Sequence, residues 1–175
     1  YRPRRLLRLC QPLPVKLRIG QIPFRVGTKG VLTEKNLAMI ANTSPRELPT
    51  GLTIKIGRKA NKIYLLSLNY VLAQKSYVPC VRVELRYTDG SVDERDLVNP
   101  YNFDFFGQNS GINTREYALN PVPRHNQVYY KDTHLTMTDV LCDGSKILAE
   151  VRFRSIATET FFGLAGMTLN IPEGE

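Results

Sequence analysis

Residues 79–97, PCVRVELRYTDGSVDERDL, constrain the fold more than any other stretch of the chain. Apolar and polar side chains alternate strictly over residues 81–88, which predicts a β-strand with one face buried and the other in water. Asp89-Gly90 then supplies the positive φ angles of a two-residue type I′ turn. The sequence therefore predicts an antiparallel hairpin, with residues 91–97 as its second arm.

A two-residue turn also determines which residues of the two arms face each other. The opposite-charge pairs expected on the solvent face are Arg86–Asp93 and Glu84–Arg95. Each such pair contributes about 0.2–1 kcal/mol. Leu85 would face Glu94 in this register, so we expect a bulge or an early divergence of the arms near Glu94.

Other short runs predict further strands. They span residues 52–56, 62–70, 134–142, 147–155 and 161–170. Residues 62–70 (KIYLLSLNY) are apolar on both faces, which is typical of a central strand covered on both sides. Pro23 removes a hydrogen-bond donor from the run 20–26, so that run is expected at a sheet edge. Residues 33–40 are the single helical candidate.

These patterns predict an all-β fold, an antiparallel β-sandwich, because a parallel sheet would need helical crossovers that the chain does not supply. Residues 15–175 are expected to form one domain, since 175 residues suit a single core. Residues 1–14, rich in arginine and proline, are expected to be an extended basic arm or linker. Neither a membrane helix nor a signal peptide is recognisable, and the start at Tyr1 suggests an excised or mature piece.

No residues are expected to be catalytic. The chain has two histidines, His125 and His134, and lacks the common hydrolase, metalloprotease and phosphate-loop motifs. The acidic cluster at residues 93–96 lies on a strand with arginine partners, which favours salt bridges over a glycosidase carboxylate pair. The three cysteines have no metal-ligand spacing, and two of them, Cys80 and Cys142, are expected to be small buried hydrophobes.

Four segments together resemble a known type of module. They read GQIPFRV, KIYLLSLNY, VELRYTDGS with an acidic second arm, and ILAEVRFRSIATETFFGLAGMTL. Over residues 15–169 the chain resembles the galactose-binding-like jelly-roll modules, similar to carbohydrate-binding modules, of polysaccharide-degrading enzymes. Such modules often carry a tryptophan in their binding loops. This chain has none, so a sugar platform would be built on tyrosine or phenylalanine.

The resemblance implies a secreted or periplasmic, non-catalytic accessory module of a glycoside hydrolase or related enzyme. Its expected partner is a glycan or the neighbouring catalytic domain; neither a nucleic acid nor a membrane is expected. No cofactor is expected, and the alternative of a structural calcium ion bound in a loop is left open.

Ligand contacts are expected in two long connections between strands, because rigid strands present variable loops for binding. A sugar site combines an aromatic face with planar polar groups. The predicted ligand-binding residues are Tyr101, Asn102, Arg115 and Tyr117. Alternatively, the aromatic residues of these connections close the end of the sandwich or dock against a catalytic domain.

Two further alternatives follow from charge and context. The net charge of +8 suits a freestanding binding module for polyanions, either nucleic acid or acidic glycan. The alternation in residues 151–154 is found in RNA-binding sheets, although burial of Val151 and Phe153 with Arg152 and Arg154 in water is the favoured interpretation. An enzyme whose site is completed by another domain is the third alternative.

Overall fold

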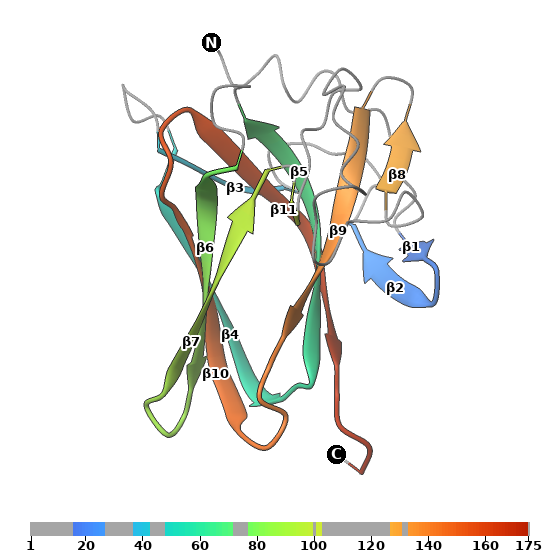
Figure 1. The fold of residues 1–175 in the computed structure, drawn as a ribbon. Helices are drawn as coiled ribbons and strands as arrows, with labels where there is room; N and C mark the ends of the chain where they lie inside the picture. Colours follow the sequence, from blue (N-terminus) through green and yellow to red (C-terminus); the bar gives the residue numbers. More distant parts are fainter. Residues whose placement is uncertain are drawn as a thin grey trace.

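The computed structural model describes residues 16–26, 37–42, 48–71, 77–99, 101–102, 127–130 and 133–174. These ranges contain strands and no helix, which confirms the predicted all-β class (Figure 1). The strands are β1 (Lys16–Ile19), β2 (Ile22–Arg25), β3 (Ala38–Ala41), β4 (Gly51–Lys59), β5 (Lys62–Val71), β6 (Pro79–Tyr87), β7 (Val92–Val98), β8 (Gln127–Tyr130), β9 (Thr133–Leu141), β10 (Ile147–Ser155) and β11 (Thr160–Asn170). The predicted basic arm at residues 1–14 lies outside the described residues.

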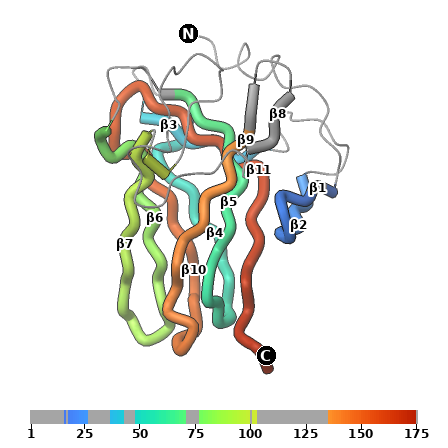
Figure 2. Tube along the Cα trace, turned by 45° about the vertical axis from the view of Figure 1, so that its right-hand side comes forward, coloured from blue at the N-terminus to red at the C-terminus, as the bar shows by residue number. Residues whose placement is uncertain are grey.

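Two antiparallel sheets form a β-sandwich, as predicted. One sheet has the order β4-β10-β6-β7 and the other β3-β11-β5-β9-β8. β1 and β2 form a separate hairpin outside the five-stranded sheet (Figure 2). Pro23 lies in this two-stranded hairpin, which agrees with its expected edge position.

The five-stranded sheet is covered on both faces, so the sandwich has a third, partial layer. Leu65 of β5 packs in the core between the two sheets, whereas Leu66 packs in a second cluster with Phe24 of the β1–β2 hairpin. The prediction that residues 62–70 form a central strand apolar on both faces is confirmed. Across the main core, Phe153 of β10 stacks on Phe162 of β11, with ring centroids 5.5 Å apart.

The β6–β7 hairpin exists, but its predicted two-residue type I′ turn is wrong. The Tyr87 amide donates to the Ser91 carbonyl at 3.0 Å, and the Gly90 amide donates to the Tyr87 carbonyl at 3.1 Å. These bonds enclose a three-residue loop in which Gly90 alone has a positive φ, 86°. Asp89 stabilises this loop, because its Oδ1 accepts from the Ser91 amide at 2.9 Å and from the Ser91 hydroxyl.

The longer loop shifts the hairpin register by one residue, so the expected pairs Arg86–Asp93 and Glu84–Arg95 are wrong. The structure instead pairs Arg86 with Val92, Leu85 with Asp93, Glu84 with Glu94 and Arg82 with Asp96. The register shift of this strand pair lies between Pro79 and Val81, not near Glu94. A one-residue shift turns every side chain of the second arm to the other face, which is why all the expected pairs failed together.

The helical candidate at residues 33–40 is wrong in its described part. Ala38–Ala41 forms β3, which pairs with β11 at the edge of the five-stranded sheet. Ile40 lies opposite Phe162 and is buried in the main core. Burial against a neighbouring strand determines that this segment is a strand, because so short a segment has little helical stability of its own.

Candidate functional site

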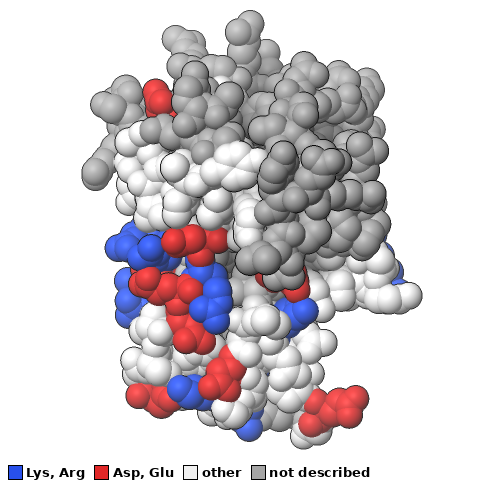
Figure 3. Space-filling view, in the orientation of Figure 1, with Lys and Arg blue, Asp and Glu red and all other residues white. Residues whose placement is uncertain are grey.

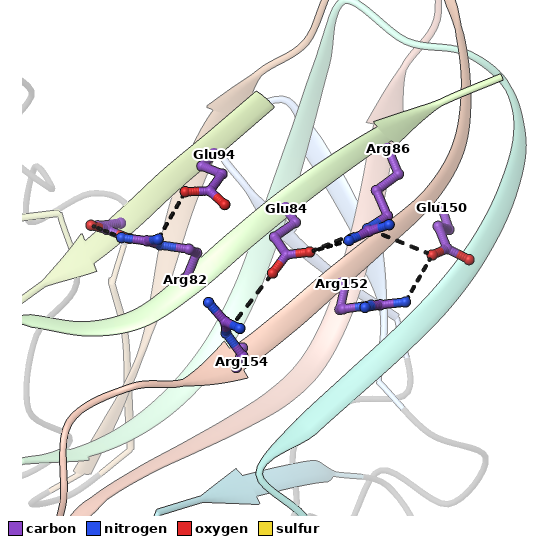
Figure 4. A network of polar contacts seen from close by, with 8 residues as sticks. Arg82, Glu84, Arg86, Glu94, Glu150, Arg152 and Arg154 are labelled. Carbon is purple, nitrogen blue, oxygen red and sulfur yellow. Dashed lines mark hydrogen bonds and ion pairs between the residues drawn. The ribbon is translucent and has the colours of Figure 1, made fainter. Parts of the chain in front are cut away.

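The outer face of the four-stranded sheet carries an interlocked set of charges, here called the charged face (Figures 3 and 4). It consists of Lys55, Arg82, Glu84, Arg86, Glu94, Asp96, Glu150, Arg152 and Arg154. Glu84 lies near its centre with only 6% of its side chain exposed, 3.0 Å from Arg86 Nη2 and 3.9 Å from Arg154 Nε.

Carboxylates also contact the remaining cations of the charged face. Arg82 contacts Asp96 at 2.9 Å and Glu94 at 2.8 Å, and the hydrogen bond that Arg82 donates to Asp96 raises the pKa of Arg82. Glu150 contacts Lys55 and Arg152, and the Lys55 ammonium holds the pKa of Glu150 below its ordinary value. Cations already neutralised in this way are poorly suited to bind a polyanion.

The alternation in residues 151–154 builds this face and the core at once. Val151 and Phe153 are fully buried, whereas Arg152 and Arg154 lie on the solvent side. The favoured interpretation of this strand is confirmed. An RNA-binding sheet needs its aromatic rings on the exposed face, and here the ring of Phe153 is in the core.

Two Asp-Gly-Ser turns lie together at one end of the sandwich, here called the turn end. They connect β6 to β7 and β9 to β10, and Lys146 Nζ joins them, at 3.1 Å from Asp89 Oδ2 and 3.9 Å from Asp143 Oδ2. Hydrogen bonds from Ser91, with a further one from Lys146, lower the pKa of Asp89 to about 2. The Tyr87 hydroxyl accepts from the Asp143 amide at 2.9 Å. These contacts link the two turns to each other. The repeated Asp-Gly-Ser is the sequence pattern that indicates both turns.

Neither the thiols nor the acidic residues of the described chain form a reactive or metal-binding group. Cys80 is fully buried, as expected for a small hydrophobe, whereas Cys142 is only partly buried. This partial burial raises the pKa of the Cys142 thiol to about 11. Among the described residues, no cluster of three or more His, Cys, Asp or Glu side chains could hold a metal ion. His125 lies outside the described residues.

The opposite end of the sandwich, where β6 begins and β7 ends, is here called the loop end. Two of the four predicted ligand-binding residues, Tyr101 and Asn102, lie at this end, shortly after β7 ends at Val98. Arg115 and Tyr117 lie outside the described residues. Tyr101 is partly exposed.

Asn102 anchors the chain after β7. Its Oδ1 accepts from the Val98 amide at 2.7 Å, and its Nδ2 donates to the Asp96 carbonyl at 2.8 Å. The Thr138 hydroxyl of β9 donates to the Asn102 carbonyl at 2.6 Å. Asn102 thus joins the edge of one sheet to the other and holds the adjacent Tyr101 in place.

Tyr77 is the residue of the loop end that the sequence did not reveal. It lies two residues before β6 begins, its φ is 62°, and 52% of it is exposed. The left-handed region costs a bulky residue about 1–2 kcal/mol. The Tyr77 amide donates to the Asn99 carbonyl at 2.6 Å, which places Tyr77 beside the segment that carries Tyr101.

Uncharged polar side chains, here called the polar floor, lie on the inner face of the five-stranded sheet toward the loop end. They are Ser67, Asn69, Thr136 and Thr138, all buried. Asn69 Nδ2 donates to Ser67 Oγ at 2.9 Å, whereas Asn69 Oδ1 and Thr136 Oγ1 have no hydrogen-bond partner. Each such atom costs about 1–3 kcal/mol if it stays unpaired. The interior therefore changes from apolar to uncharged polar as it approaches the loop end.

Comparisons with family models, curated proteins and solved structures found no match to this chain. In the described ranges, no helix has the length and apolar character needed to cross a bilayer. The described residues thus form three distinct surfaces: a charged face of five cations and four carboxylates, a turn end held by ion pairs, and a loop end that carries Tyr77 and Tyr101.

Proposed function

We propose that this chain is a non-catalytic accessory module of a larger carbohydrate-active enzyme and binds a neutral glycan at its loop end. One observation carries the proposal: the outer faces of both sheets already make contacts within the chain. The charged face is occupied by ion pairs, and the outer face of the five-stranded sheet packs under the β1–β2 hairpin. Among the described residues, the loop end presents two tyrosines, Tyr77, which is exposed, and Tyr101, which is partly exposed.

The charge distribution supports a neutral ligand over a polyanion. Besides Glu159, the formal charges nearest the described loop end are Arg154, one residue before β10 ends, and the Arg82–Asp96 pair, which belong to the ion pairs of the charged face. A hydroxyl-rich ligand suits such a surface, because tyrosine rings pack against sugar C–H groups and uncharged side chains exchange hydrogen bonds with hydroxyls. A polyanion site would instead need several cations without carboxylate neighbours.

Binding of the chain to soluble neutral polysaccharides in affinity gels tests this proposal. We expect retardation by at least one neutral polysaccharide that changes little between about 50 and 200 mM salt, whereas binding through six phosphates or sulfates would weaken by about 10³-fold or more. The paired replacement Tyr101→Ala and Tyr117→Ala should abolish retardation without shifting the melting temperature by more than a few degrees. Val92→Ala, at an exposed position of the turn end, is the matched control and should bind normally.

Two results would contradict the proposal. Retardation only by sulfated polysaccharide or nucleic acid, lost at higher salt, would favour the polyanion-binding alternative. Failure to bind any neutral polysaccharide, together with protection of Tyr101 from solvent in the parent enzyme, would show that the loop end docks against the catalytic domain.

A further inference from the structure

We propose that Tyr77 is the aromatic platform on which a sugar ring of a neutral glycan lies. The inference rests on the proposed function and adds a residue in a connection different from the two that were predicted to bind. Of the large apolar side chains that the described residues expose, Tyr77 is the only aromatic one.

The backbone conformation of Tyr77 is the first argument. A φ of 62° is readily adopted by glycine and is unfavourable for a side chain of this size. A strained residue persists where the surrounding structure holds it, and such residues are concentrated at binding sites. The Tyr77 amide is bonded to the Asn99 carbonyl at 2.6 Å, and Pro79 is paired with Val98 two residues further on. The strain is therefore maintained by the pairing of β6 with β7.

The surroundings of Tyr77 are the second argument. Asn99 connects it to the segment of Tyr101, and Asn102 fixes that segment to β9 by the hydrogen bond from Thr138. Two tyrosines are thus carried by backbone that is held at both sheets. Pre-organised rings of this kind bind with little loss of conformational entropy.

The size of the exposed apolar surface favours a small ligand over a protein domain. Tyr77 and Val78 are the only large hydrophobic side chains that the described part of the loop end exposes. The core of a protein interface is a contiguous patch of apolar and aromatic side chains, and the described loop end exposes two. One sugar ring needs a single aromatic face and a few polar groups.

The test exploits the second strained position in the chain. Glu159 has a φ of 59° and is also exposed at the loop end. Tyr77→Gly and Glu159→Gly should each keep or raise the urea midpoint, because glycine relieves the left-handed strain. Only Tyr77→Gly should weaken retardation by the polysaccharide that binds the unaltered chain, by at least tenfold. Tyr77→Phe, which keeps the ring, should weaken it by less than threefold.

The outcomes separate this inference from the proposed function. If the unaltered chain binds a neutral polysaccharide and Tyr77→Gly binds equally well, the inference is wrong and the proposed function stands. If the unaltered chain binds none, both are wrong. Should Tyr77→Gly fold poorly, Tyr77→Asn replaces it, since asparagine tolerates the left-handed region, and the same tenfold loss is required.

Discussion

The stacked rings of Phe153 and Phe162 join the two sheets, and a double-mutant cycle can measure their contribution. Both side chains are fully buried, their centroids are 5.5 Å apart and their planes differ by 21°. Each Phe→Leu replacement should lower the free energy of unfolding by on the order of 1–2 kcal/mol, part of the about 3–5 kcal/mol known for Phe→Ala in cores. An aromatic pair adds about 0.5–1.5 kcal/mol beyond burial. The double variant should therefore cost less than the sum of the single variants by that amount.

Equilibrium unfolding in urea, followed by circular dichroism, measures these free energies. The control is a cycle between Phe153 and Leu66, which packs in the second cluster on the other side of the five-stranded sheet. Its coupling should be within about 0.3–0.5 kcal/mol of zero, as for independent sites. If the Phe153–Phe162 coupling were no larger than the control, the two sheets would not meet at this contact as described.

Two further predictions concern the turn end. Gly90→Val should lower the free energy of unfolding by about 1–2 kcal/mol, because valine must adopt a φ of 86°, although its Cβ would meet no atom within 4 Å. An unchanged urea midpoint would contradict the left-handed position. The pKa of Asp89 is lowered from 3.8 to about 2, so its carboxylate stabilises the fold above about pH 4, and this contribution is lost as the pH falls toward 2. Unfolding measured between pH 2 and 6 should show a shallower acid dependence in Asp89→Asn, and the proposed contribution is disproved if the two profiles are parallel.

The fold class could be predicted from the sequence because strand periodicity is a local property. The alternation of residues 81–88 and the two-sided run 62–70 each report directly on burial. The hairpin register could not be predicted the same way. Two-residue and three-residue turns both place a glycine at positive φ, so Asp89-Gly90 fits either length. The three-residue loop in the structure is stabilised by hydrogen bonds that Ser91 donates to Asp89.

The candidate site was predictable only in part. Tyr101 and Asn102 could be found because they lie in a long connection after a strong strand. Tyr77 could not, since its left-handed conformation results from pairing with Asn99, a residue distant in the sequence. The same holds for Glu84 and Arg154, which meet only because β10 pairs with β6.

The positions of the last two strands have a consequence for the order of folding. β10 lies between β4 and β6, and β11 lies between β3 and β5, so residues 147–170 supply an interior strand to each sheet. Neither sheet can be completed while residues 147–170 are still in the ribosome. Until this segment emerges, β4 and β6 lack β10, the strand that lies between them. Pairing over such sequence distances is slow, and unpaired strand edges promote association between chains. Productive folding of this domain is therefore expected to follow, and not accompany, its synthesis.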